Sequence, residues 1–194
     1  MVVADVFPAL EIPPPGRICQ WAWRFPDTLS RMSSKSWTIQ PGDTLVRGDI
    51  HRSFGGNPQA GIARSGSTAN VIVYSDPDKA GDNGYDFDGW DIAEEVFYYT
   101  GEGKVGDQKM DRGNRAIADH AADEYALRLF LAIGNKPGSQ ARIQRYLGEF
   151  AVDPERPYEV HTAPGTDGVP RKVFVFRLRP VGHVVTENVP TRSR

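Results

Sequence analysis

The stretch Asn83-Gly84-Tyr85-Asp86-Phe87-Asp88-Gly89-Trp90 places a tyrosine and an aspartate three residues apart, and Tyr99-Thr100-Gly101 follows it with a second tyrosine. Two tyrosine rings can sandwich a planar ring, because aromatic faces stack in offset arrangements. A carboxylate at Asp88 can accept a hydrogen bond from an amine at the edge of that ring. A pocket for a DNA base extruded from its stack needs both features. Cytosine suits such a carboxylate, because it presents an amine where thymine presents a carbonyl.

Four further motifs surround this stretch: Val46-Arg47-Gly48-Asp49-Ile50-His51-Arg52, Gln59-Ala60-Gly61-Ile62, Asp107-Gln108 and Asn114-Arg115-Ala116. In this order, and together with the two tyrosine motifs, they resemble the SET and RING-associated (SRA) domain. Members of that family read 5-methylcytosine by flipping it out of the duplex. The resemblance extends from Pro41 to Gly182, which is most of the chain.

The resemblance implies a role for each residue of the base pocket. Tyr85 and Tyr99 would stack on the flipped base, and Asp88 would accept a hydrogen from its amine. Thr100 would help to line the methyl site beside Gly101. The residues alone leave another interpretation open, in which Tyr99 is a core residue of a strand and the stretch around Tyr85 and Asp88 is a surface turn.

The resemblance also implies contacts to DNA. Gln59 stands where the family places a side chain that enters the minor groove and fills the hole left by the flipped base, although a plain turn would fit the same residues. Arginine and lysine would contact phosphates, since such contacts supply affinity that is independent of sequence. The predicted DNA-binding residues are Arg47, His51, Arg52, Gln59, Gly61, Arg64, Lys104, Arg112 and Arg115.

One part of the family pattern is missing. Members that detect hemimethylated CpG carry a long basic finger between the Tyr-Thr-Gly turn and the Asp-Gln pair. Here only Glu102-Gly103-Lys104-Val105-Gly106 fills that space. We therefore expect a reader of modified cytosine with little preference for sequence context or for hemimethylated sites.

The composition limits the classes of protein that fit. A chain of 194 residues with 39% hydrophobic residues has room for one domain with a real core. A net charge of -2 argues against indiscriminate binding of polyanions. The charges are segregated, however: residues 76–107 hold ten acidic residues against two lysines, whereas residues 171–194 hold six basic residues and one acidic one.

Cysteine and histidine usage give no sign of a cofactor or a metal. The single cysteine, Cys19, allows no internal disulfide, and the four histidines lack the spacing of zinc ligands. The chain contains no apolar run of the length that a signal peptide or a membrane span requires. The predicted location is therefore the cytoplasm, at the nucleoid, without membrane association.

The sequence predicts three regions: an N-terminal arm at 1–36, a DNA-binding domain at 37–185 and a C-terminal tail at 186–194. Apolar or alternating runs predict strands at 37–47, 69–74, 96–99, 142–152 and 171–178. An apolar stripe at helical spacing predicts one main helix over Asn114–Ile133. This order indicates an α+β fold, a twisted and partly closed β-barrel of about six strands with one main helix packed on it, and the resemblance implies the same fold.

Two other functions stay open. A small nuclease or base-modifying hydrolase of the same barrel type would use Glu102 and Asp107, although the sequence has no His-Asn-His nuclease motif. An RNA-binding module of similar architecture would need a face for unstacked bases. We favour a non-catalytic reader whose partner is double-stranded DNA containing modified cytosine, and the sequence leaves a nuclease partner open.

Overall fold

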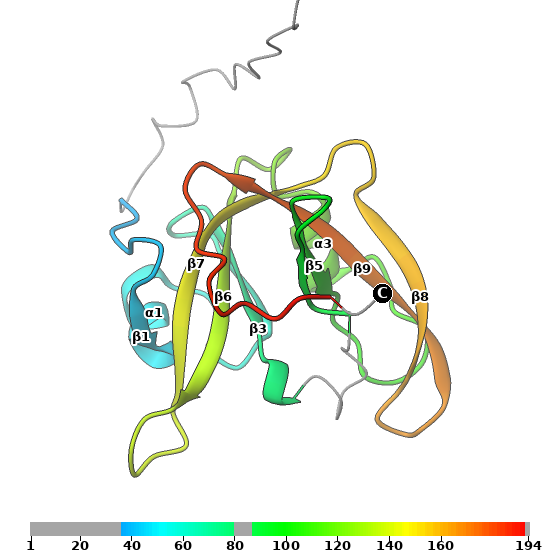
Figure 1. The fold of residues 1–194 in the computed structure, drawn as a ribbon, viewed down its shortest axis with the longest axis horizontal. Coiled ribbons are helices and arrows are strands. Elements are labelled where there is room, and N and C mark those ends of the chain that lie inside the picture. Colours follow the sequence, from blue (N-terminus) through cyan, green and yellow to red (C-terminus); the bar gives the residue numbers. More distant parts are fainter. Residues whose placement is uncertain (1–35, 80–86, 193–194) are drawn as a thin grey trace, which may run out of the picture. The chain divides into compact units, whose positions relative to one another are not determined.

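The computed structural model describes residues 36–79 and 87–192. The predicted arm, apart from Ser36, lies outside the described residues, and so does Tyr85, which the sequence predicts for the base pocket. Within those ranges the chain forms one nine-stranded sheet with two short α-helices and one 3-10 helix (Figure 1). The elements are β1 (Thr44–Val46), α1 (Arg47–Phe54), β2 (Ile62–Ser65), β3 (Asn70–Ser75), η2 (Pro77–Lys79), β4 (Gly89–Asp91), β5 (Val96–Thr100), α3 (Arg112–Ala118), β6 (Ala126–Asn135), β7 (Arg142–Val152), β8 (Tyr158–Pro164) and β9 (Pro170–Val181).

The main path of the sheet runs β2-β3-β6-β7-β9-β5-β4, with β1 paired to β7 and β8 paired to β9. Strands β3 and β6 are parallel, with Asn70 opposite Ala126 and Ser75 opposite Leu131. The other pairs of named strands are antiparallel. The path ends at β2 and β4, which do not pair with each other in the described part of the chain, so the sheet is open.

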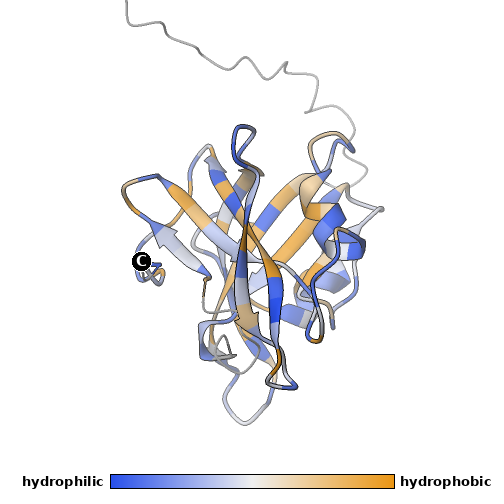
Figure 2. Ribbon diagram, turned by 90° about the vertical axis from the view of Figure 1, so that its right-hand side faces the viewer, coloured by the Kyte–Doolittle hydropathy of each residue, from blue (hydrophilic) through white to orange (hydrophobic). Residues whose placement is uncertain are grey.

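Strand β3 is buried on both faces, as is typical of a strand with a parallel neighbour. Successive side chains of a strand point to opposite faces. Val71 and Val73 accordingly pack in one apolar cluster with Ile117 of α3, whereas Ile72 packs in a second cluster with Ile50 of α1. Figure 2 shows the hydrophobic bands along the strands. The two helices thus pack on opposite faces of the sheet.

The predicted helix over Asn114–Ile133 is wrong. Helix α3 ends at Ala118, a turn follows in which the Tyr125 amide donates to the His120 carbonyl (2.7 Å), and the next ten residues form β6. An apolar run of this length fits a buried strand as well as a helix, so periodicity alone does not separate them. Pairing on both sides, with β3 and with β7, decides for the strand.

Other predicted elements also differ from the structure. The stretch 37–47 is a strand only over Thr44–Val46, and Arg47 begins helix α1 instead. Strands β2 and β8 were not predicted. Two short α-helices therefore replace the one main helix, and nine strands in an open arrangement replace about six strands of a partly closed barrel, within the residues described.

The residues after β9, expected to form a tail, run along strand β4. The Trp90 amide donates to the Pro190 carbonyl (2.8 Å), the Arg192 amide donates to the Trp90 carbonyl (3.1 Å), and Val189 is buried in the core. No helix in the described ranges combines the length and the apolar character needed to cross a lipid bilayer.

Candidate functional site

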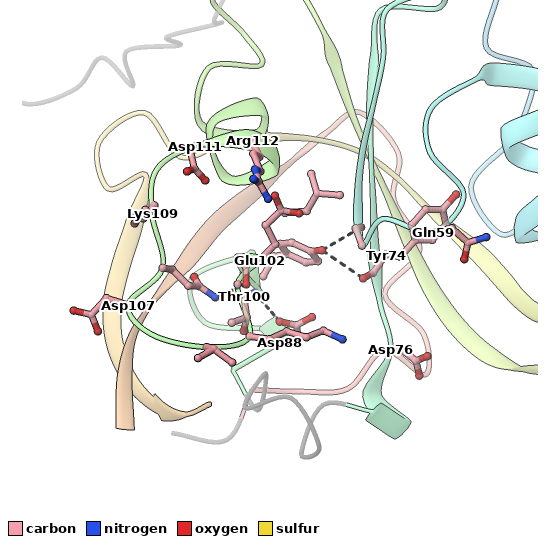
Figure 3. A pocket seen from close by; sticks show the side chains of 18 of the residues that line it. Gln59, Tyr74, Asp76, Asp88, Thr100, Glu102, Asp107, Lys109, Asp111 and Arg112 are labelled. Atoms are coloured by element: carbon pink, nitrogen blue, oxygen red, sulfur yellow. Dashed lines mark hydrogen bonds between the residues drawn. The ribbon is translucent and has the colours of Figure 1, made fainter. Parts of the chain in front are cut away.

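A cavity of about 740 Å³ lies between the end of β3, strand β5 and the segment that leads into α3. Cavities of roughly 300–1,000 Å³ are typical of sites for small ligands. Figure 3 shows Asp88 and Thr100 on one side of it and Tyr74 and Gln59 on the other. Of the residues predicted for the pocket and for DNA binding, the wall contains Arg47, Gln59, Gly61, Asp88, Tyr99, Thr100, Gly101, Lys104 and Arg112.

Asp88 is half-buried, and both oxygens of its carboxylate accept hydrogen bonds. Oδ1 accepts from the Thr100 backbone N–H (2.7 Å), and Oδ2 accepts from the Ser75 hydroxyl (2.7 Å). Burial raises the pKa of Asp88 to about 6, although the bonds from Thr100 and Ser75 favour the ionised form. Because each carboxylate oxygen can accept more than one hydrogen bond, the group can take a further donor from the cavity.

Tyr99 lines the cavity and belongs to the core at the same time. Its side chain is 4% exposed and packs in the apolar cluster that contains Ile62 and Val73. The hydroxyl lies 3.4 Å from the Gly61 carbonyl and 3.5 Å from the Tyr74 carbonyl, at the long end of the hydrogen-bond range. Stacking of a base on Tyr99 stays a prediction.

Arg47 and His51, both predicted to contact DNA, have partners inside the protein. The Arg47 guanidinium lies 3.9 Å from the centre of the Tyr74 ring and donates to the Ala60 carbonyl. His51 Nδ1 lies 2.8 Å from the Gly55 carbonyl oxygen and Nε2 lies 2.9 Å from the Tyr74 hydroxyl. Since a carbonyl only accepts, Nδ1 carries the proton and Nε2 accepts from Tyr74. Burial lowers the pKa of His51, which keeps the ring neutral. Both residues thus hold Tyr74 in the cavity wall.

Two buried amides fix the segment between β5 and α3. Gln108 Nε2 donates to the Gly101 carbonyl (2.6 Å), and its Oε1 accepts from the Phe174 N–H of β9 (2.8 Å). Asn114 Oδ1 accepts from the Glu102 N–H (2.7 Å), and its Nδ2 donates to the Glu102 carbonyl (2.9 Å). A Cβ at Gly101 would lie 2.4 Å from Asn114 Oδ1, so this position requires glycine. The Asp-Gln and Asn-Arg-Ala motifs therefore shape the loop beside the cavity.

The two candidate catalytic carboxylates take part in the same bracing. Glu102 Oε1 accepts from the Gly113 N–H (2.8 Å), and Asp107 Oδ1 accepts from the Lys172 N–H (2.7 Å). In the described part of the chain, no group of three or more histidine, cysteine, aspartate or glutamate side chains could hold a metal ion. Both carboxylates accept hydrogen bonds from backbone amides, whereas a metal-dependent nuclease would need its carboxylates to coordinate a cation.

The remaining predicted basic residues fall into two groups. Lys104 and Arg112 are exposed at the mouth of the cavity. The others are exposed and paired with aspartates, and exposed pairs of this kind contribute only ~0–1 kcal/mol, so a phosphate can replace the aspartate at small cost. These pairs are Arg52–Asp49 (2.6 Å), Arg64–Asp123 (3.1 Å) and Arg115–Asp119 (3.6 Å).

Sequence reasoning missed Ser75, Tyr74 and the pair formed by Asp76 and Arg142. Ser75 orients Asp88, Tyr74 forms a wall of the cavity, and Arg142 donates to Asp76 beside it. A signal was present, because the buried strand β3 ends in Tyr74 and Ser75 and the charged Asp76 follows it directly. Their partners could not be read from the sequence, since they come from distant segments.

Comparisons with solved structures show a likeness to ScoMcrA. The sulfur binding domain and SRA domain of ScoMcrA complexed with phosphorothioated DNA is 27% identical with a TM-score of 0.56, over 74% of this chain and 40% of that chain. The type IV phosphorothioation-dependent restriction endonuclease ScoMcrA is 28% identical with a TM-score of 0.55, over 78% of this chain and 29% of that chain. This chain therefore matches less than half the length of either.

A second likeness concerns the fold alone. The SUVH5 SRA domain in complex with hemimethylated CG DNA has a TM-score of 0.52 at 18% identity, over 80% of this chain and 97% of that chain. No curated protein sequence matches this chain. The family model described as ScoMcrA-like, SRA domain matches residues 41–194. With more than half of its residues covered by that model, the chain belongs to the ScoMcrA-like SRA domain family.

Proposed function

We propose that this domain reads a modified cytosine, with 5-methylcytosine as the simplest case, by flipping it out of duplex DNA into the cavity beside Asp88. The observation that carries the proposal is the half-buried Asp88 carboxylate, which Thr100 and Ser75 orient and which retains capacity for another donor. The amine of cytosine is such a donor, and thymine offers none at that position. Similar domains have been solved in complex with phosphorothioated DNA and with hemimethylated CG DNA, which supports modified DNA as the class of ligand.

The same pose gives roles to the other residues predicted for the pocket. Tyr99 stacks on one face of the base and Tyr85, which lies outside the described residues, is proposed for the other face. Thr100 and Gly101 line the side that receives the methyl group. Burying one methyl contributes ~0.8 kcal/mol, and a close-fitting pocket discriminates by ~1–3 kcal/mol. The preference for methylated over plain cytosine is therefore about tenfold.

The rim of the cavity supplies the contacts to DNA. Gln59 and Gly61 approach the minor groove, and Lys104 and Arg112 contact phosphates, together with Arg52, Arg64 and Arg115. A Cβ at Gly61 would meet only the Tyr99 hydroxyl, at 3.9 Å, so the fold itself does not require glycine there. Close approach of the DNA backbone gives that glycine a purpose.

The short turn Glu102–Gly106 bears on specificity. Its tip carries an exposed valine, Val105, and the turn is joined to the β8–β9 hairpin by the bond from the Thr166 N–H to the Lys104 carbonyl (2.9 Å). A five-residue turn tied down in this way has no reach to the opposite strand. We infer that the domain tolerates different sequence contexts and does not select hemimethylated sites.

The domain acts as a reader, and any cleavage belongs to a nuclease that works with it, in the same chain or in another. The engagement of Glu102 and Asp107 by backbone amides supports a non-catalytic role. The likeness to a restriction endonuclease, of which this chain matches 29%, supports a nuclease partner. Such a reader would work where the DNA is, at the nucleoid in the cytoplasm.

Binding to matched duplexes tests the proposal directly. Fluorescence anisotropy at one ionic strength would compare duplexes that differ only at one position, which carries 5-methylcytosine, cytosine or thymine. We expect an affinity about tenfold higher for 5-methylcytosine than for cytosine, and the weakest binding for thymine. Equal affinity for all three would refute the proposal. A phosphorothioated duplex without modified bases serves as a further arm, and a preference for it would reassign the ligand to the DNA backbone.

A further inference from the structure

The segment that follows β9 extends the edge of the sheet next to Asp88. Its backbone pairs with Trp90 through both Pro190 and Arg192, and Thr191 forms a parallel bridge with Trp90. Val189 anchors the segment in the core. Figure 1 shows this part of the chain, in red, returning from β9 towards β5. The backbone directly after Asp88 is therefore held by residues from the far end of the domain.

The packing at Gly89 is close enough to exclude a side chain. A Cβ at this residue would lie 2.8 Å from the Arg192 nitrogen and 3.0 Å from the Pro190 carbonyl oxygen. Both are backbone atoms that a side chain could not push aside without moving the segment. Gly89 follows Asp88 directly, so displacement of the segment would displace the carboxylate as well.

A second cavity, of about 460 Å³, lies beside Tyr98 of β5, the neighbour of Tyr99. Adjacent residues of a strand face opposite ways, so this cavity lies across the sheet from the proposed base pocket. The Arg192 guanidinium lies 3.7 Å from the centre of the Tyr98 ring. Arg192 also donates to Glu159 Oε2 (3.1 Å), and its side chain is only 14% exposed. A cation with both an aromatic and an acidic partner is held firmly there.

Contacts from Arg192 continue to the residue before Asp88. His161 Nε2 lies 2.8 Å from the same Oε2 of Glu159, and the His161 ring packs against the Phe87 ring at 4.7 Å between centroids. Phe87 also packs against the apolar cluster around Tyr98. Both neighbours of Asp88 are therefore held in place. Phe87 packs against His161, which binds Glu159, the partner of Arg192. Gly89 packs against the backbone of Pro190 and Arg192.

We propose that residues 189–192 are a positioning element of the base pocket, in which Arg192, acting through Glu159 and through the backbone of Trp90, holds Asp88 in the geometry that recognises the base. Arg192 does not line the base pocket and is a positioning residue. This inference rests on the proposed function, because it assigns the purpose of Arg192 to recognition by Asp88. Residues 189–192 fall in the stretch 186–194, which the sequence predicts to be a tail, and they pack against strand β4 and the core.

Amide exchange and binding, measured on the same variants of the full chain, test this role. The Thr100 amide donates to Asp88 Oδ1, so its hydrogen exchange reports the position of the carboxylate without any DNA. Arg192→Ala should speed exchange at Thr100 by about tenfold. It should also reduce the preference for 5-methylcytosine over thymine at the same position by about three- to fivefold, because a displaced Asp88 accepts less well from the amine. Arg192→Lys, which keeps the charge, should restore part of both.

The matched control is Arg156→Ala, which removes the same charge from an exposed arginine paired with Glu94 (3.2 Å). It should leave Thr100 exchange and the cytosine preference as in the parent, so that a general loss of DNA affinity is separated from a loss of selectivity. If Arg192→Ala does not fold, Glu159→Gln breaks the same link with little change in shape and is measured in its place.

The outcomes separate this inference from the proposed function. Unchanged Thr100 exchange and unchanged preference in Arg192→Ala and Glu159→Gln would overturn the positioning role. A parent protein with no preference for modified cytosine would overturn the proposed function, while Thr100 exchange still decides whether Arg192 positions Asp88. If Thr100 exchange is faster in the Arg156→Ala control as well, a general loss of stability explains the faster exchange in Arg192→Ala. That outcome would also overturn the inference.

Discussion

At Asp88, a single carboxylate serves both the fold and the proposed recognition of the base. It satisfies the Thr100 amide and the Ser75 hydroxyl, and burial raises its pKa to about 6. A carboxylate whose pKa is raised by burial towards neutral pH is a candidate for a functional group. Substitutions at this residue therefore change stability and selectivity together, and tests of function must separate the two.

Asp88→Asn should fold like the parent and show a weaker preference for 5-methylcytosine over thymine, because Asp88 is proposed to accept from the amine that thymine lacks. The Asn oxygen can still accept from the Thr100 amide, and the Ser75 hydroxyl can accept from the new amide. Replacing a hydrogen bond to a charged group by a neutral one removes part of the ~1.5–3 kcal/mol that such a bond contributes. Asp88→Ala should abolish the preference and also lower the melting temperature, because two donors lose their acceptor. Thermal unfolding and anisotropy on the same samples check both results.

The selectivity should depend on pH between 5 and 7. Recognition of the amine needs the carboxylate form, so the ratio of affinities for duplexes with 5-methylcytosine and with thymine at the same position should fall as the pH drops through about 6. Asp88→Asn is the control and should show a flat ratio, because the asparagine side chain has no proton to gain or lose in this range. A parent ratio that is equally flat would separate Asp88 from recognition.

Stability should move in the opposite direction over the same window. The pKa of Asp88 is raised from its ordinary value of 3.8 to about 6 in the folded protein, so the folded state binds this proton more tightly than the unfolded chain does. Its contribution to stability is therefore full below 3.8 and is lost as the pH rises through about 6. Urea unfolding measures the free energy of unfolding of the parent and of Asp88→Asn at pH 5 and pH 7. Between these pH values, the free energy of unfolding of the parent should fall relative to that of Asp88→Asn.

Tyr99→Phe should change both stability and binding little. The hydroxyl makes only long contacts, of 3.4 and 3.5 Å, whereas the ring is buried in the core. We expect a loss below ~1 kcal/mol in unfolding free energy, since bonds of this length are weak. The fluorescence of 2-aminopurine placed next to the modified cytosine should rise on binding, because flipping removes a base that stacks on it. Retained affinity of Tyr99→Phe together with this rise would agree with stacking of the base on the ring. A complete loss of binding would instead assign the hydroxyl to the ligand.

Among the elements, the segment between β5 and α3 depends most on side chains. Gln108 and Asn114 supply bonds to backbone groups that have no strand or helix partner there. Gln108→Ala and Asn114→Ala should each lower the unfolding free energy by ~2–4 kcal/mol, because each leaves buried backbone groups unsatisfied. Chemical denaturation measures this loss. Arg115→Ala, adjacent to Asn114 and exposed, is the control and should stay within ~0.5 kcal/mol of the parent.

The same segment shows how far the sequence could predict the molecule. The motif order located Asp88, Thr100 and Gly101, which the structure brings together at one cavity wall. It did not show that Gln108 and Asn114 brace the loop, because both bind backbone atoms, those of Phe174 and Glu102, and a motif does not reveal which backbone atoms a side chain will meet. The helix expected up to Ile133 failed for a similar reason, since pairing with β3 and β7 overrode an ambiguous apolar pattern.

At the scale of the whole molecule, the affinity for DNA should depend on the salt concentration. It should not depend on whether the opposite strand is methylated. Each neutralised phosphate contributes a log–log slope of about -0.9, so replacing Arg112 or Lys104 by alanine should make the slope shallower by about one unit without changing the cytosine preference. Fully methylated and hemimethylated duplexes should bind alike, since the turn Glu102–Gly106 is short. Titrations at several salt concentrations measure both, and a tenfold preference for hemimethylated CpG would contradict the second expectation.

The parallel pairing of β3 with β6 has a consequence for how the chain reaches its native state. Asn70 pairs with Ala126, and the residues between these strands include Asp88, Tyr99 and both braced motifs. Closing so long a loop costs chain entropy before any contact compensates for it, and sheets with such distant partners form slowly. On the ribosome, β3 can pair with β2 at once, whereas its parallel neighbour β6 becomes available only after the whole intervening segment has been synthesised. We therefore expect the segment that is proposed to read DNA to slow the completion of the sheet, because its ends must be brought together before β3 and β6 can pair.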